Sequence, residues 1–218
     1  MTRAEFRARL QGRRCYVGLD LGSTKDLTAT VAVFPDDVGG GFDVLPQFFM
    51  PDDNILERVR RDRVPYDQWK HDGELVATPG PVTDYEYIRV HLHAWADEFD
   101  IRELPYDPWN ATDLVSRLLQ DGLPCVPIRQ GFVSLTAPTK SLETAVLSKR
   151  LRHDGHPILR WNIGNIVVET DAAGNYKLSK ALSTEKIDGA AALVNAIDRM
   201  DRHSSTDGPA EDPVVVGA

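Results

Sequence analysis

The alternation of apolar and polar positions in the first quarter of the chain predicts a meander of three β-strands. In residues 15–20 the side chains alternate faces, so that Leu19 points to one side and Asp20 to the other. Residues 27–34 are rich in strand-forming side chains, and residues 42–50 continue the pattern after a glycine-rich turn. We therefore expect the Asp20 carboxylate at a strand end, exposed and rigidly held.

Apolar side chains spaced three and four residues apart predict amphipathic helices farther along the chain. The clearest stripe lies in residues 85–99, behind a capping box that begins at Thr83. A strand over residues 101–106, a helix over 110–120 and a strand over 123–128 then form a strand–helix–strand unit. Such a crossover indicates parallel pairing of its two strands.

The second half of the chain predicts two further helices and a second hairpin. Proline favours the first turn of a helix, so we expect one helix to begin at Pro138. Residues 165–170 and 176–178 flank a turn and predict the hairpin. The closing helix, over residues 184–200, has Asp188 in its opening turns. The predicted fold class is α/β, a mixed central sheet with helices on both faces and an extra β-hairpin.

Length and composition favour one globular domain. The 218 residues are 42% hydrophobic, and no apolar run approaches the roughly 20 residues that cross a bilayer, so we expect no membrane contact and a soluble, intracellular protein. We assign residues 1–14 to a basic leader, 15–200 to the domain and 201–218 to a flexible tail. The two cysteines lack the spacing of a zinc site or of a disulfide framework.

The net charge of −8 argues against a protein that coats nucleic acid through charge alone. The charge is unevenly distributed, however, because residues 129–186 carry nine Lys and Arg against five Asp and Glu. An acidic body with one basic lobe could hold phosphates against a carboxylate cluster. A solvated surface of mixed charge explains the same count equally well.

Three aspartates stand at the ends of predicted elements. Asp20 ends the first strand, Asp107 follows a central strand, and Asp188 lies near the start of the closing helix. Each has an ordinary structural explanation, since aspartate is common in turns and at helix N-termini. Jointly they match the ribonuclease H-like arrangement, in which carboxylates hold two divalent cations at the rim of a mixed sheet. Carboxylates without His or Cys suit Mg²⁺ or Mn²⁺ better than Zn²⁺.

Several short motifs stand in order between residues 16 and 200. They are Gly18-Leu19-Asp20 with Asp26, Val64-Pro65-Tyr66, Thr78-Pro79-Gly80, Tyr106-Asp107-Pro108-Trp109-Asn110-Ala111-Thr112, Arg129-Gln130-Gly131-Phe132, Leu151-Arg152-His153 and Ser183-Thr184-Glu185-Lys186-Ile187-Asp188-Gly189. Together they closely resemble the nuclease half of the large terminase subunits of tailed bacteriophages.

This resemblance implies a metal-dependent endonuclease that cuts concatemeric double-stranded viral DNA during genome packaging. It implies Asp20, Asp107 and Asp188 as the catalytic residues and as the ligands of two Mg²⁺ or Mn²⁺ ions, with Asp26 as an accessory acid. It also implies four partners: double-stranded DNA, a terminase ATPase domain, the small terminase subunit and the portal protein. The expected location is the cytoplasm of the infected bacterial host.

Basic side chains of the positively charged lobe are candidates for contacts to DNA phosphates. The candidates are Arg152, Arg160, Lys177, Lys180 and Lys186. Of these, Lys177 is favoured, because it lies on the predicted second hairpin and a protruding hairpin can follow a groove. The alternative for each is an ordinary surface cation.

The chain lacks a phosphate-binding loop of the form G-x-x-x-x-G-K-[ST], since it contains no Gly-Lys pair. ATP-driven translocation by that mechanism is therefore not expected of this chain, which would be an isolated nuclease domain, an excised piece or the product of a split gene. Three alternatives remain: a non-catalytic module that binds DNA or docks a capsid partner, another ribonuclease H-like nuclease such as a junction resolvase, and an actin-like ATP-binding domain, which the Leu19–Lys25 loop resembles.

Overall fold

The structure of the chain is a computed structural model. It describes residues 1–22, 27–36, 39–53, 55–109 and 112–206. Within these ranges no helix is both long enough and apolar enough to cross a membrane.

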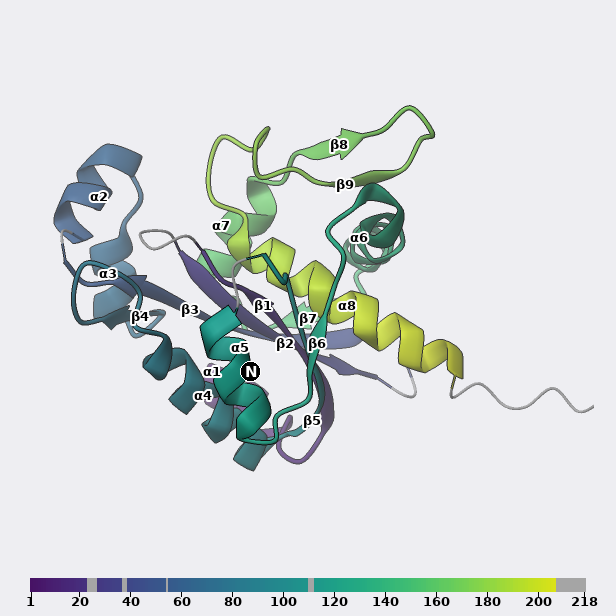
Figure 1. The fold of residues 1–218 in the computed structure, drawn as a ribbon, viewed down its shortest axis with the longest axis horizontal. Helices are drawn as coiled ribbons and strands as arrows, with labels where there is room; N and C mark the ends of the chain where they lie inside the picture. The colour runs from purple at the N-terminus through teal and green to yellow at the C-terminus, as the bar shows by residue number, and fades with distance from the viewer. Residues whose placement is uncertain (23–26, 37–38, 54, 110–111, 207–218) are drawn as a thin grey trace, which may run out of the picture.

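A seven-stranded mixed sheet forms the centre of the described chain (Figure 1). Its strands follow the order β4-β3-β2-β1-β5-β6, and β7 pairs with β3. The strands are β1 (Arg14–Asp20), β2 (Thr28–Pro35), β3 (Phe42–Pro51), β4 (Leu75–Thr78), β5 (Asp100–Tyr106), β6 (Cys125–Pro127) and β7 (Leu151–His153). The predicted meander is confirmed by the antiparallel pairing of β1, β2 and β3. The predicted crossover is confirmed by the parallel pairing of β5 with β6.

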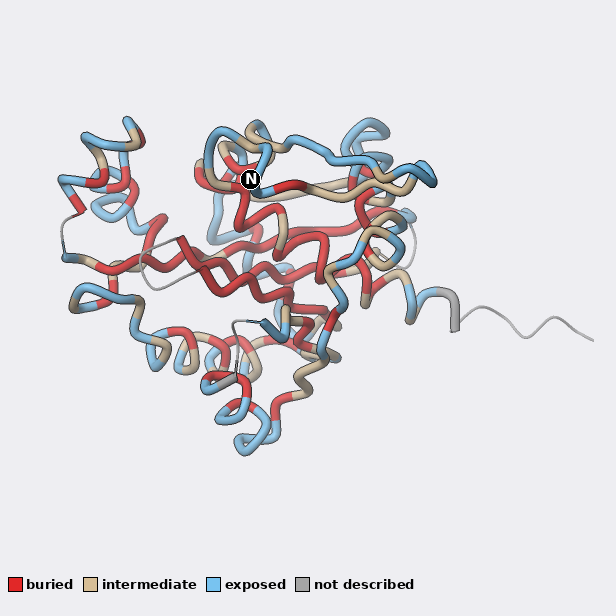
Figure 2. Tube along the Cα trace, turned by 45° about the horizontal axis from the view of Figure 1, so that its top comes forward, coloured by how far each residue is buried: buried red, intermediate tan, exposed pale blue. Residues whose placement is uncertain are grey.

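Helices cover both faces of the sheet, as expected for central strands that are buried along almost their whole length (Figure 1). They are α1 (Arg3–Ala8), α2 (Ile55–Asp62), α3 (Tyr66–His71), α4 (Tyr85–Glu98), α5 (Thr112–Gln120), α6 (Phe132–Leu147), α7 (Pro157–Gly164) and α8 (Asp188–Thr206). Apolar side chains of α1, α4 and α5 form one core with Val17 and Leu19 of β1. Those of α6, α7 and α8 form a second core with Tyr16 of the same strand. Buried positions therefore gather along the central strands and α8 (Figure 2).

The predicted hairpin forms a separate two-stranded sheet beyond α6 and α7 (Figure 1). Its strands β8 (Val168–Thr170) and β9 (Tyr176–Leu178) are antiparallel, with Glu169 opposite Lys177. The fold class predicted from the sequence is therefore confirmed, including this addition to the central sheet. The chain returns from β9 directly to α8, so the hairpin stands next to the N-terminal end of that helix.

Three predicted helix starts are wrong. Helix α8 begins at Asp188 and not at residue 184. Helix α6 begins at Phe132 with Gly131 as its N-cap, and Pro138 lies buried inside it. Proline removes a single backbone donor, and the packing of this helix on α8 compensates for that loss. In α4 the N-cap is Asp84, whose side chain accepts from the Glu86 backbone N–H at 2.9 Å. The hydroxyl of Thr83 is buried and makes no hydrogen bond among the described atoms.

Both ends of the predicted domain also differ from expectation. The residues assigned to a basic leader contain α1, and Phe6 of this helix and Leu10 just after it are buried in the same core as the apolar side chains of α4. Amphipathic packing, which the run of arginines obscured in the sequence, therefore joins this segment to the domain. At the other end α8 continues through Met200 to Thr206, so the boundary predicted at residue 200 falls inside a helix. Residues 207–218 of the predicted tail lie outside the described residues.

Gly18 explains how α8 can cross the sheet so closely. A Cβ atom at this position would lie 1.8 Å from the backbone oxygen of Ala192 and 3.0 Å from the backbone nitrogen of Ala196. Only a residue without a side chain permits this approach of helix backbone to strand backbone. The contact places the N-terminal end of α8 above the end of β1.

Candidate metal centre

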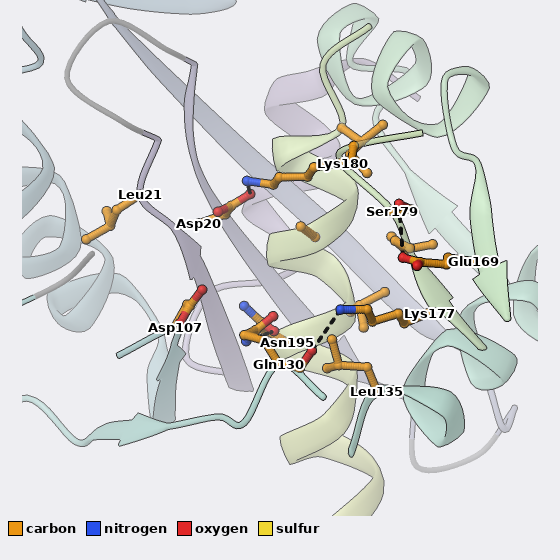
Figure 3. Close-up of a pocket in the computed structure, with 15 residues that line it drawn as sticks. Asp20, Leu21, Asp107, Gln130, Leu135, Glu169, Lys177, Ser179, Lys180 and Asn195 are labelled. Carbon is orange, nitrogen blue, oxygen red and sulfur yellow. Dashed lines mark hydrogen bonds and ion pairs between the residues drawn. The ribbon is translucent and has the colours of Figure 1, made fainter. Parts of the chain in front are cut away.

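The pairing of β1 with β5 brings two of the predicted aspartates together. These neighbouring strands are parallel, and Leu19 lies opposite Tyr106 in their register. Asp20 and Asp107 each follow one of these paired residues, so both emerge at the carboxyl edge of the sheet (Figure 3). Because strands of opposite direction would have placed them at opposite edges, parallel pairing is the feature that creates the site.

Asp188 reaches the same edge of the sheet from a helix and not from a strand, as the first residue of α8. The start of this helix is held by Asn162 of α7, whose side-chain oxygen accepts from the Gly189 N–H at 2.6 Å. The side-chain amide of Asn162 in turn donates to the backbone oxygen of Lys186 at 3.0 Å. The Asp188 carboxylate is thus buried and fixed, with only 4% of the residue exposed.

Lys180 joins two of the three aspartates. Its amine lies 2.6 Å from Oδ2 of Asp20 and 3.0 Å from Oδ1 of Asp188. Burial acts to lower the pKa of this amine, but the two carboxylates outweigh burial and raise it. Lys180 is therefore a cation shared by Asp20 and Asp188 (Figure 3 shows its contact with Asp20).

Asp20 is buried, which corrects the expectation that its carboxylate is exposed. Only 8% of the residue is accessible, because α8 and the Lys180 side chain cover the end of β1. Burial raises the pKa of Asp20, and the negative charges of Asp188 and Asp107 raise it further, while Lys180 opposes them. The three aspartates therefore influence one another electrostatically, although no pair of them is hydrogen-bonded.

Asp107 is more open than the other two acids and is held by the turn that follows it. Its Oδ1 accepts from the backbone N–H of Trp109 at 3.0 Å, which is the pattern of an Asx turn. The backbone of Trp109 therefore builds the turn that positions the acid. The indole itself points away from the core, and 89% of the residue is exposed.

A cavity of about 340 Å³ opens beside these acids, between β1, β5, α8 and β9 (Figure 3). Asp20, Asp107, Lys177 and Lys180 all contribute to its wall. Lys177 donates from its amine to the backbone oxygen of Gln130 at 3.1 Å and lies 5.0 Å from the centre of the Phe132 ring. Two of the five predicted DNA-contacting cations, Lys177 and Lys180, therefore line the cavity together with three acids, Asp20, Asp107 and Glu169.

The other three predicted cations lie elsewhere. Arg152 is at the opposite end of the sheet, where it binds Asp36 at 2.9 Å and Asp43 at 2.9 Å, and Asp43 is also paired with Arg9 and Arg13. Since this cluster neutralises a buried carboxylate, Arg152 stabilises the fold at that end of the sheet, away from the three aspartates. The DNA contact predicted for it stays a prediction.

Arg160 lies on α7 and lines a different surface depression from that of the acids. Lys186 precedes Asp188 by two residues, and its backbone oxygen accepts from Asn162 and from Asn165. Neither side chain lines the cavity beside Asp20. Asp26, the predicted accessory acid, lies outside the described residues.

Two amide side chains in the cavity wall were not predicted. Asn195 is 4% exposed and donates to the backbone oxygen of Leu19 at 3.2 Å, which ties α8 to the residue before Asp20. Gln130 donates to the side-chain oxygen of Asn195 at 3.4 Å. One sequence signal could have identified Asn195, because it lies seven residues after Asp188 and therefore on the same face of α8.

Carboxylates are suitable ligands for a divalent metal, but in this structure Asp20 and Asp188 form ion pairs with Lys180. Within the ranges that the structure describes, no group of three or more His, Cys, Asp and Glu side chains is arranged to hold a metal ion. Lys180 instead stands between Asp20 and Asp188. However, Oδ2 of Asp188 is buried with no hydrogen-bond partner in the described structure, so an oxygen remains available for a cation. All-carboxylate donors fit a hard ion such as Mg²⁺ or Mn²⁺.

Comparison with known proteins identifies the family. A family model described as the endonuclease domain of the terminase large subunit matches residues 6–204. The chain belongs to this family. The large terminase subunit of Enterobacteria phage HK97 is 37% identical over 187 residues, which cover 85% of this chain and 37% of that protein. The chain thus spans less than half of that relative's length.

Solved structures agree with this terminase assignment. The crystal structure of the HK97 large terminase matches with a TM-score of 0.80 and 34% identity, over 91% of this chain and 43% of that one. The large terminase nuclease from the thermophilic phage G20c, solved with bound magnesium, matches with a TM-score of 0.56 over 87% of this chain and 84% of that one. At 13% identity the second likeness shows the fold alone. The ribonuclease H-like fold predicted from the sequence is therefore confirmed.

Proposed function

We propose that this terminase domain is a metal-dependent endonuclease that cuts concatemeric double-stranded viral DNA during genome packaging, by two-metal-ion hydrolysis of a phosphodiester. The observation that carries the proposal is the convergence of Asp20, Asp107 and Asp188 from β1, β5 and α8 on one edge of the sheet. A separate solved terminase nuclease of the same fold was obtained with bound magnesium.

Each residue of the site has a role in this proposal. Asp20, Asp107 and Asp188 would hold the ions, which when bound supply a water of lowered pKa and stabilise the leaving oxygen of the phosphodiester. Asn195 and Gln130 fix the end of β1 and so orient Asp20. The exposure of Asp107 at the cavity leaves the approach of a DNA backbone open on that side.

The remaining expectations follow from family membership. The chain covers 37% of the HK97 subunit, and we propose that during packaging it works together with a terminase ATPase domain, a small terminase subunit and a portal protein. The site of action would be the cytoplasm of the infected bacterial host. These partners account for functions, such as translocation, for which this chain has no phosphate-binding loop.

Cleavage of supercoiled plasmid tests the proposal. The purified chain is incubated with plasmid in Mn²⁺, in Mg²⁺ and in EDTA, beside a variant that combines Asp20→Asn, Asp107→Asn and Asp188→Asn. We expect nicked and linear DNA in the presence of metal, none in EDTA, and none with the variant. If both proteins bind DNA and neither cuts it in any metal, even with the ATPase domain added, a non-catalytic DNA-binding module becomes the better description.

Binding at different salt concentrations tests the role of Lys177. Because each phosphate contact releases counter-ions, Lys177→Gln should reduce the slope of log K against log salt by about 0.9, which corresponds to one contact. The measurement is fluorescence anisotropy of labelled duplex DNA in EDTA. Arg152→Gln is the matched control, because Arg152 lies at the far end of the sheet and its loss should leave the slope unchanged. A reduced slope for Arg152→Gln alone would place the DNA on the opposite face.

A further inference from the structure

Lys180 belongs to the connection between the hairpin and α8, and its backbone is held by a neighbouring serine. The Ser179 N–H donates to the backbone oxygen of Val167 at 2.9 Å, and the Ser179 oxygen atoms accept from Leu182 and Ser183. The Lys180 side chain is less restrained, because 51% of it is exposed towards the cavity. The residue therefore has a fixed backbone and a side chain that can leave its position.

The amine of Lys180 stands where one cation contacts two buried carboxylates. It lies 2.6 Å from Asp20 and 3.0 Å from Asp188, whose side chains are 12% and 6% exposed. Two buried carboxylates so placed repel each other and need a positive charge between them. The ammonium group meets this requirement in the chain itself.

A divalent ion held by the same oxygens would also supply a positive charge between Asp20 and Asp188, and its charge is twice that of the ammonium. The ammonium contacts the same carboxylate oxygens that the metal would need, so the two compete for those lone pairs and the ammonium must move when the metal binds. Lysine is well suited to leave, since its charge sits on a flexible four-carbon chain. The open cavity lies on its exposed side.

We propose that Lys180 is a built-in counter-ion that occupies the metal position between Asp20 and Asp188 in the metal-free domain and must be displaced when the metal binds. This inference rests on the proposed function, because it presumes that Asp20 and Asp188 are metal ligands. Its consequence is that Lys180 stabilises the metal-free site and weakens the affinity for metal. The domain would then load metal only above a threshold concentration.

Calorimetric titration with Mn²⁺, without DNA, tests this competition. Lys180→Gln should bind Mn²⁺ at least about tenfold more tightly than the unaltered chain, since the competing charge is gone. Lys180→Arg keeps the charge and should bind no more tightly than the unaltered chain. Lys177→Gln is the matched control, because it removes a positive charge from the same cavity. The amine of Lys177 contacts the backbone oxygen of Gln130 and not the acids. Its affinity should stay within about threefold of the original.

Thermal melting supplies a second, independent measurement. In EDTA, Lys180→Gln should melt below the unaltered chain, because Asp20 and Asp188 then lack a counter-charge. Saturating Mn²⁺ should raise the melting temperature of Lys180→Gln by more than that of the unaltered chain, since tighter binding stabilises more. If Lys180→Gln is unfolded in EDTA and folds when Mn²⁺ is added, the result also supports the proposal.

A parallel titration of Asp188→Asn separates the possible failures. If the unaltered chain binds Mn²⁺, Asp188→Asn does not, and Lys180→Gln binds no more tightly, the metal site stands and the role of Lys180 is overturned. If neither the unaltered chain nor Lys180→Gln binds Mn²⁺ at millimolar concentration, the metal site and this inference both fall.

Discussion

Replacing Asp107 with asparagine is expected to abolish metal-dependent DNA cleavage while leaving the fold and most DNA affinity intact. Asparagine keeps the shape of the side chain, and its oxygen can still accept from the Trp109 N–H that shapes the turn. It lacks the negative charge that a divalent ion requires. Since metal coordination contributes several kcal/mol to catalysis and about 1.4 kcal/mol is a factor of ten, we expect at least about a 100-fold loss of rate. Plasmid nicking in Mn²⁺ measures it.

Asp107 is the cleanest of the three acids for this experiment. Removing Asp20 or Asp188 would also remove a partner of Lys180 and change the charge balance of the buried site. Asp113→Asn is the matched control, because this acid lies on the following helix, is largely exposed and pairs with Arg117. Its cleavage rate should be unchanged. Full activity of Asp107→Asn would remove Asp107 from the site.

Replacing Gly18 with alanine is expected to cost about 3 kcal/mol of folding stability, near the upper end for overpacking a core. The added methyl group would overlap the backbone of α8 at Ala192, which no side-chain rotation can relieve. For a domain of this size the melting temperature should fall by about 6 to 12 °C. Because α8 also carries Asp188, cleavage should fall as well. Urea denaturation and thermal melting measure the loss.

Gly164→Ala is the control for this substitution. Gly164 ends α7, and a Cβ atom there would meet no atom within 4 Å. At such a position alanine restricts the unfolded chain and should leave stability unchanged or slightly raised. Equal stability of the two alanine variants would contradict the close contact between β1 and α8.

Local patterns in the sequence predicted most of the fold because burial on one face imposes a period on the chain. The spacing of Ile88, Leu92 and Trp95 reports one face of α4 packing on a core. Strands β1–β3 were found from their strand-forming residues, and they are buried on both faces. The same patterns failed where a segment is short or contains a misleading residue. Strand β7 and helix α7 have too few residues to show a period, and Pro138 concealed the true start of α6.

The candidate site was predictable to the extent that its residues stand at the ends of elements. Asp20, Asp107 and Asp188 could be identified in this way, and the order of the motifs around them resembled the terminase family. Gln130 lay within a quoted motif, yet only its contact with Asn195 shows that it supports the end of β1. Such contacts join residues 65 positions apart and leave no local signal in the sequence.

The roles of the basic residues were the hardest to predict from the sequence. Arg152 and Lys180 were predicted on the same grounds, as cations of one basic lobe that could meet DNA phosphates. The structure pairs Arg152 with Asp43 at one end of the sheet and Lys180 with Asp20 and Asp188 at the other. Their sequence neighbourhoods contain none of these partners except Asp188.

By itself the sequence determined the fold class, the strands that carry Asp20 and Asp107, the helix that carries Asp188 and the resemblance to the terminase family. These follow from periodic burial and from motifs, which are properties of neighbouring residues. Only the tertiary structure decided that Asp20 is buried and that Lys180 neutralises it. The physical reason is that burial and charge depend on which distant segments meet, here where the absence of a side chain at Gly18 lets α8 cross β1.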